Sequence, residues 1–102
     1  ELERAFAEPW ALVFKHSTRC PVSSYAYREV AEFRRRHPEA SVYVVHVVEQ
    51  RPLSNALAAR TGVRHESPQA IVLSEGKVLW ADSHQGVTAA ALEALLPAPV
   101  AD

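Results

Sequence analysis

The stretch ALVFKHSTRCPVS, residues 11–23, contains the chain's only cysteine, Cys20, between an apolar run and a helical pattern. Residues 11–14 are a short apolar run, typical of a strand that is buried on both faces. After the cysteine, apolar side chains recur at helical spacing at Val22, Ala26, Val30 and Phe33. Proline suits the first position of a helix, so Pro21 places the helix start directly after Cys20. The stretch therefore predicts a strand, a short turn and a helix.

Cys20 is expected to be the N-cap residue of this helix. The unpaired N–H groups and the positive dipole end of a helix N-terminus both favour a thiolate over a thiol. We expect Arg19 and His16 to add positive charge, and the hydroxyls of Thr18 and Ser23 to donate hydrogen bonds to the anion. Lowering the pKa of a cysteine from about 8.5 to about 6 raises its thiolate fraction at pH 7 from about 3% to about 90%. The sequence predicts an activated nucleophile.

The rest of the chain alternates strand and helix signals. Residues 41–48 are almost all β-branched or aromatic, which predicts a central strand. Gly62 is expected to end the second helix, and Gly76 to take a positive φ in a hairpin turn. The predicted elements are a helix end near Phe6, strand 10–15, helix 21–36, strand 41–48, helix 52–60, strand 70–73, turn 74–77, strand 78–81, loop 82–86 and a last helix capped by Thr88.

From the first strand onward, this order reads βαβαββα. Both strand–helix–strand steps predict parallel pairing through right-handed crossovers, and the closing hairpin predicts an antiparallel pair. This is the order of the thioredoxin fold, an α/β architecture with a mixed four-stranded sheet flanked by helices. At 102 residues we expect a single domain, residues 1–102, that ends in a tail over residues 97–102.

The thioredoxin fold places a cysteine after the first core strand and a cis-proline at the start of the third. This sequence has Cys20 and Ser67-Pro68 in those two places. We therefore expect the Ser67-Pro68 bond to be cis, although most X-Pro bonds in folded proteins are trans. The backbone of Ser67 would then be free to pair with an extended substrate beside the sulfur.

Composition excludes several classes of function. The net charge of −1 gives no electrostatic reason to expect nucleic acid or membrane partners. No apolar stretch approaches the roughly 20 residues that span a bilayer, and no signal peptide is visible. The chain begins at Glu1 rather than methionine, which leaves its native N-terminus open. One cysteine makes no internal disulfide, so we expect a reducing, cytoplasmic setting.

Thioredoxins and dithiol glutaredoxins contain a C-x-x-C motif, in which the second cysteine resolves the mixed disulfide. In this sequence Ser23 occupies the position of that second cysteine. A cycle between two cysteines of the chain is therefore impossible. Cys20 can still attack a mixed disulfide, become thiolated itself, and be released by a second small thiol. The sequence predicts a monothiol thiol-disulfide oxidoreductase without a tightly bound cofactor.

Four blocks of the chain, residues 14–23, 51–55, 61–69 and 83–88, resemble the YtxJ-like monothiol bacilliredoxin family. The resemblance extends over nearly the whole chain and departs at Gln85, where an aromatic residue is expected. It implies a thioredoxin fold and a cytoplasmic role in bacillithiol redox chemistry, with Cys20 as the nucleophile. Bacillithiol, a cysteinyl-glucosaminyl-malate thiol, would be the co-substrate, and bacillithiolated proteins would be the partners.

Bacillithiol carries malate carboxylates and sugar hydroxyls, so its site should offer cations and hydrogen-bond donors around the sulfur. We expect the Ser67-Pro68 step to hold the substrate beside it. The other candidate ligand-binding residues are Lys15, Arg64, His65, Ser83 and His84.

Four alternatives remain open at this stage. The least favoured is an iron-sulfur carrier like the C-G-F-S monothiol glutaredoxins, because Pro21 and Val22 replace their glycine and phenylalanine. His16 and Cys20 have the spacing of two metal ligands, but one pair is a weak zinc signal and we predict no metal. Residues 17–20 resemble the T/S-x-x-C of one-cysteine peroxidases, although Val13 stands where their pattern has proline. A non-catalytic binding module on the same fold would contain an unreactive cysteine.

Overall fold

A computed structural model of the chain describes residues 2–17 and 21–97, so residues 1, 18–20 and 98–102 lie outside the described part. Thr18, Arg19, Cys20 and most of the predicted tail are among the latter. The elements are α1 (Leu2–Ala7), β1 (Trp10–His16), α2 (Pro21–Arg36), β2 (Val42–His46), α3 (Arg51–Thr61), β3 (Gln69–Ser74), β4 (Lys77–Ser83), the 3-10 helix η1 (His84–Gly86) and α4 (Ala89–Glu93). The strands form the predicted mixed four-stranded sheet, in the order β2-β1-β3-β4.

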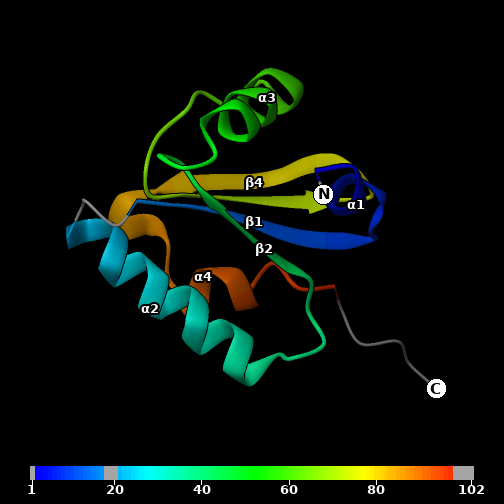
Figure 1. Ribbon diagram of the computed structural model, residues 1–102. Coiled ribbons are helices and arrows are strands. Elements are labelled where there is room, and N and C mark those ends of the chain that lie inside the picture. The colour runs from blue at the N-terminus through cyan, green and yellow to red at the C-terminus, as the bar shows by residue number, and fades with distance from the viewer. Residues whose placement is uncertain (1, 18–20, 98–102) are drawn as a thin grey trace.

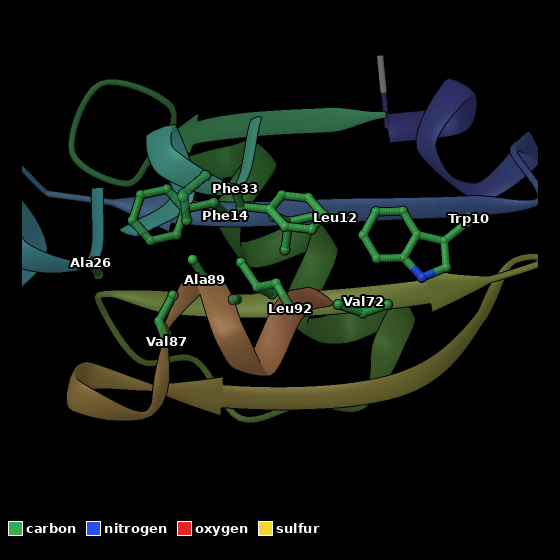
Figure 2. Packing of buried hydrophobic residues seen from close by; sticks show 11 residues of the cluster. Trp10, Leu12, Phe14, Ala26, Phe33, Val72, Val87, Ala89 and Leu92 are labelled. Carbon is green, nitrogen blue, oxygen red and sulfur yellow. The ribbon is translucent and has the colours of Figure 1, made fainter. Parts of the chain in front are cut away.

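The central strands β1 and β3 are buried on both faces. Helices α2 and α4 cover one face of the sheet, and α3 lies over the other (Figure 1). Figure 2 shows the first apolar layer, in which side chains of β1 and β3 pack with those of α2 and α4, and the ring centroids of Trp10 and Phe33 are 5.9 Å apart. Full burial of one such side chain contributes about 1.5–3 kcal/mol, so the two layers fix the sheet between the helices.

Strand β2 lies at an edge of the sheet, so the prediction of a central strand over residues 41–48 is wrong. Val44 packs with the cluster under α2, and Val45 packs with the cluster under α3. The β-branched run therefore reflects packing on both faces of the strand rather than a neighbour on both sides, because strand propensity reports side-chain burial. The strand is also shorter than predicted and ends at His46.

The direction of β3 also corrects a prediction. β1 and β2 pair in parallel as expected, but β3 runs antiparallel to β1 and does not touch β2. Helix α3 has 11 residues and rises roughly 16 Å, and residues 62–68, the return segment, lead the chain back to the end of the sheet that it left (Figure 1). The second predicted parallel step, from β2 through α3 to β3, is therefore wrong. The chain returns along α3 and residues 62–68 to the end where β2 stops, so β3 starts there and runs in the opposite direction.

The turn signals are confirmed. Gly62 has φ 73° and ends α3, with its N–H donating to the carbonyl of Ala58. Gly76 has φ 81° in the β3–β4 turn, and Glu75 before it also has a positive φ of 51°. Positive φ at both central residues defines a type I′ turn, whose twist matches that of the paired strands.

The segment before the last helix differs in part from the predicted loop over residues 82–86. Its first two residues extend β4, where Ser83 pairs with Gln69, and the next three form η1. The predicted cap of α4 is confirmed, since the Thr88 side chain accepts a hydrogen bond from the N–H of Ala91. The extension brings Ser83 to the start of β3.

Replacing Gly62 by alanine should lower the free energy of unfolding by about 1–2 kcal/mol, because a Cβ atom disfavours the left-handed conformation. No atom lies within 4 Å of the position that this Cβ would take, so a steric clash adds nothing. Gly62→Asn should cost less, since asparagine tolerates this conformation. Urea unfolding measures both variants, and equal losses would contradict the conformational explanation.

Candidate active site

The candidate site lies where β1 ends and where α2 and β3 begin. Cys20 lies outside the described residues, but it directly precedes Pro21, and the predicted helix start at Pro21 is confirmed. The Ser67-Pro68 peptide bond at the entrance to β3 is cis, as expected. In the sheet register Gln69, the first residue of β3, is paired with Lys15 near the end of β1. The elements that flank residues 18–20 and the cis-proline therefore meet at one end of the sheet.

Buried polar side chains gather at this same end. Within residues 2–17 and 21–97 they are Lys15 and His16 in β1, Ser23 in α2, Ser54 in α3 and Gln69 in β3. Burying a polar group is costly unless it is hydrogen-bonded, and the remaining residues of β1 are apolar. The cluster therefore calls for a role beyond packing, and it divides into two groups, one on each face of the sheet.

The first group lies on the α2 side. The Ser23 hydroxyl accepts a hydrogen bond from the backbone N–H of Ser17 at 2.9 Å, and it lies 2.8 Å from Nδ1 of His16. Burial, followed by the nearby charge of His46, lowers the pKa of His16. This shift disfavours the positive charge that the sequence predicts for His16, and the role of the ring at the thiolate stays a prediction.

The hydroxyl of Ser23 ties the end of β1 to the start of α2. Which atom of this pair donates depends on the tautomer of His16. If Nδ1 carries the ring proton, the hydroxyl accepts twice and keeps its own proton for another acceptor. The predicted hydrogen bond from Ser23 to the sulfur needs this tautomer, and it stays a prediction because Cys20 lies outside the described residues.

The second group lies on the α3 side. Nζ of Lys15 is 3.1 Å from Nδ1 of His65, and the hydroxyl of Ser54 is 3.4 Å from the same nitrogen. Burial lowers the pKa of Lys15, and burial together with the charge of Lys15 lowers the pKa of His65. Lys15 is 0% exposed and contacts the segment that leads to the cis-proline. The predicted contact of Lys15 with a bound thiol stays a prediction.

Predicted ligand residues also gather around this segment from the side of β4. The Ser83 hydroxyl donates to the carboxylate of Glu66 at 2.6 Å, and Nδ1 of His84 lies 3.5 Å from the same carboxylate. The backbone N–H of His84 donates to the carbonyl of Pro68 at 3.0 Å. Ser83 and His84 therefore lie beside the cis-proline, and their contact with a ligand stays a prediction.

Gln69 holds the segment before the cis-proline through its side-chain amide. Its side-chain amide donates to the backbone carbonyl of Arg64 at 2.8 Å, while the Arg64 side chain is exposed. The other amide atom, Oε1 of Gln69, and the hydroxyl of Ser67 are buried without a hydrogen-bond partner among the described residues. Unpaired buried polar atoms are uncommon in native proteins. The Ser67 hydroxyl is thus a candidate contact for an incoming group.

Sequence reasoning missed Gln69, Ser54 and Glu66 as members of the site. Gln69 had a visible signal, because a glutamine directly after Pro68 opens a strand that is otherwise apolar. Ser54 lies three residues before Leu57 on the buried face of α3, so helical periodicity could have found it. Glu66 has no such signal, since its partner Ser83 is distant in sequence.

Metal binding and membrane insertion find no support in the described residues. Residues 2–17 and 21–97 contain no group of three or more histidine, cysteine or carboxylate side chains that could bind a metal ion. None of the helices in the same ranges is long and apolar enough to cross a membrane.

Fold and site together define a thiol oxidoreductase of the thioredoxin fold that contains one cysteine. A solved protein assigned as an oxidoreductase with a thioredoxin fold matches at 31% identity, over 91% of this chain and 83% of that chain, with a TM-score of 0.85. A mutant thioredoxin from Halobacterium salinarum NRC-1 has the same fold, at 22% identity, 93% and 79% coverage and a TM-score of 0.71. So does Trxlp from Edwardsiella tarda EIB202, at 20% identity, 93% and 89% coverage and a TM-score of 0.70.

The family model for monothiol bacilliredoxin BrxC matches residues 1–92. The chain therefore belongs to the monothiol bacilliredoxin family, and the resemblance found in the sequence is confirmed. Its activity is thiol-disulfide exchange, and one cysteine in the sequence agrees with the monothiol form of that activity.

Replacing Ser23 by alanine should lower the free energy of unfolding by about 1–3 kcal/mol, because His16 and the Ser17 N–H lose a buried hydrogen-bond partner. Ser24 is exposed in the same helical turn, so Ser24→Ala is the matched control and should change the value by less than about 0.5 kcal/mol. Urea unfolding compares the two variants. A similar loss in both would show that the Ser23 hydroxyl is not what joins β1 to α2.

Proposed function

We propose that this protein removes bacillithiol from protein mixed disulfides by monothiol exchange at Cys20. The observation that supports this most is Ser23, which is buried and hydrogen-bonded where a second, resolving cysteine would stand. An oxidoreductase without a resolving cysteine must pass through a mixed disulfide with a small thiol. Membership of the bacilliredoxin family points to bacillithiol as that thiol.

The exchange has two steps. In the first, the Cys20 thiolate attacks the bacillithiol sulfur of the client disulfide; the client leaves as a thiolate and takes up a proton from solvent. Cys20 is then linked to bacillithiol. In the second, a free bacillithiol thiolate attacks the bacillithiol sulfur of this disulfide, and Cys20 leaves as a thiolate. The client is reduced, and two bacillithiol molecules are oxidised to their disulfide. A reducing cytoplasm supplies the free thiol that this cycle consumes.

The start of α2 is the main stabiliser of the Cys20 thiolate in this mechanism. The helix is 16 residues long and has no acidic residue in its first turn, so nothing in that turn offsets its positive end. Arg19 adds positive charge next to the sulfur in the sequence, and Thr18 is a further donor. Ser23 contributes its own proton when the His16 ring donates from Nδ1. His16 acts as a neutral positioning group for Ser23.

The substrate is held on both sides of the sulfur. On one side, Pro21, Val22, Tyr25 and Gln85 line a hollow of about 340 Å³ beside the start of α2. The amide of Gln85 and the hydroxyl of Tyr25 suit the sugar hydroxyls of bacillithiol, and Arg19 suits its carboxylates. On the other side, the Ser67 backbone pairs with the extended chain of the client. The exposed side chains of Arg64 and His84 lie next to that chain.

Incubation with oxidised bacillithiol should add one bacillithiol to the wild-type protein, because Cys20 is the nucleophile. Intact-protein mass spectrometry measures the adduct, and oxidised glutathione run in parallel tests selectivity. The Cys20→Ala variant should form no adduct and should not release bacillithiol from a bacillithiolated client. Retained exchange activity in Cys20→Ala refutes the assignment of the nucleophile, and equal labelling by glutathione refutes the choice of thiol.

Replacing Ser23 by cysteine should convert the protein into a dithiol enzyme. Residues 20 and 23 are one helical turn apart if Cys20 caps α2, a spacing that permits a disulfide. Oxidation should then remove two hydrogens from the intact mass, and the bacillithiol adduct should be short-lived. Ser24→Cys is the matched control, because its side chain lies outside the site and should leave the adduct unchanged. A stable adduct in Ser23→Cys would contradict the placement of Cys20.

A further inference from the structure

Lys15 is a fully buried lysine that has no role in the exchange mechanism proposed above. Its side chain is 0% exposed, and its β1 neighbours Ala11 and Val13 belong to the apolar cluster under α3. Lysine is almost never fully buried unless it is paired. Within residues 2–17 and 21–97 the amine contacts a histidine ring rather than a carboxylate, at 3.1 Å from Nδ1 of His65. A buried amine in an apolar layer is costly, so its contact needs a reason.

The contact between Lys15 and His65 holds the segment that leads to the cis-proline. Lys15 and Gln69 are directly opposite each other in the antiparallel β1–β3 pair, so both side chains point to the same face of the sheet. Lys15 contacts His65, and the Gln69 amide donates to the carbonyl of Arg64. Two neighbouring cross-strand side chains thus hold two consecutive residues, Arg64 and His65, which only Glu66 separates from Ser67-Pro68.

The return segment contains no regular structure that could hold it otherwise. Residues 62–66 belong to no helix or strand, and His65 is exposed apart from its contacts with Lys15 and Ser54. From the opposite side, Ser83 binds Glu66 through a hydrogen bond of 2.6 Å. Val63 packs against the apolar cluster under α3, and Pro68 is buried and accepts a hydrogen bond from the N–H of His84, so polar contacts made by residues 64–66 hold the stretch between these two anchors.

We propose that Lys15 and His65 are positioning residues for thiol exchange, which hold residues 64–67 so that the backbone of Ser67 is ready to receive the incoming disulfide. The inference rests on the substrate role proposed above for Ser67. Neither residue acts on the sulfur itself. The pair affects how well the substrate binds, and it leaves the nucleophile unchanged.

Charge limits the pH range of this contact. Nδ1 of His65 accepts a hydrogen bond from the Lys15 amine only while the ring is neutral, and two positive charges at 3.1 Å would repel each other. Arg51 faces the ring with a further positive charge, Glu66 faces it with a negative charge, and Ser54 offers a hydroxyl. Burial holds the pKa of His65 below its usual value. The contact is therefore intact above about pH 6.5 and is lost as the pH falls through the lowered pKa.

Lys15→Met tests the proposal, because methionine keeps the length and the apolar stem of lysine and removes the amine. The substrate is a peptide whose cysteine is disulfide-linked to free cysteine, so the assay does not depend on bacillithiol. KM for this peptide should rise about tenfold while kcat changes less than twofold. The further rise of KM that the wild-type protein shows as the pH falls below 6.5 should be absent in this variant. Lys77→Met is the matched control, since Lys77 is exposed at the opposite end of the sheet and should match wild type.

Two further variants separate positioning from folding and from thiol activation. His65→Phe changes an exposed residue and does not endanger the core, and it should raise KM as Lys15→Met does. The double variant should raise KM no further than either single change, because both act through one contact. The pH midpoint for alkylation of Cys20 by iodoacetamide should stay at the wild-type value in every variant. A wild-type KM in His65→Phe, or a shifted alkylation midpoint, overturns the proposal.

Hydrogen exchange keeps this test separate from the proposed function. If the wild-type protein shows no thiol-disulfide exchange with the peptide, the proposed substrate role of Ser67 fails. Amide hydrogen exchange then measures the positioning role by itself. Lys15→Met should accelerate amide exchange at residues 65–67 at least tenfold, whereas Lys77→Met should leave it unchanged. Unaltered exchange in Lys15→Met overturns the positioning role whatever the activity.

Discussion

The antiparallel pairing of β1 with β3 is the constraint on which the site depends. The register that sets Lys15 opposite Gln69 brings the end of β1, the start of α2 and the cis Ser67-Pro68 bond to one end of the sheet. Had β3 run parallel to β1, the proline would enter at the opposite end, about 20 Å away for a strand of 6 residues. A cysteine before α2 and a proline before β3 would then be unable to meet the same substrate.

The same end of the sheet contains the polar side chains that the core otherwise excludes. On the α2 face, Ser23 joins α2 to β1 through its contact with His16. On the α3 face, Lys15 and Gln69 contact residues 64–65 of the return segment. Fully satisfied buried networks specify one conformation, while partly satisfied ones cost stability. The hydroxyl of Ser67, which has no hydrogen-bond partner among the described residues, marks where this network is left incomplete beside the cis-proline.

Most elements could be predicted because their signals are local. Proline at the start of α2, Gly62 after α3 and Gly76 in the hairpin act through backbone conformation within a few residues. The errors concern relations between distant segments. The apolar run of β2 is compatible with a central or an edge strand, and the direction of β3 depends on how far residues 62–68 extend. Periodicity reports which faces of an element are buried and not which neighbours bury them.

By itself, the sequence determined the presence of a single cysteine, the absence of a resolving cysteine at Ser23, the helix start at Pro21 and the place of the cis-proline, because each depends on residue type and short-range geometry. Only the tertiary structure decided that His16 is buried with a lowered pKa and that Lys15 is a buried contact of His65 rather than a surface cation. Burial is a property of the layers that close over a side chain. Those layers come from α2 and α3, which the residues around Lys15 do not encode.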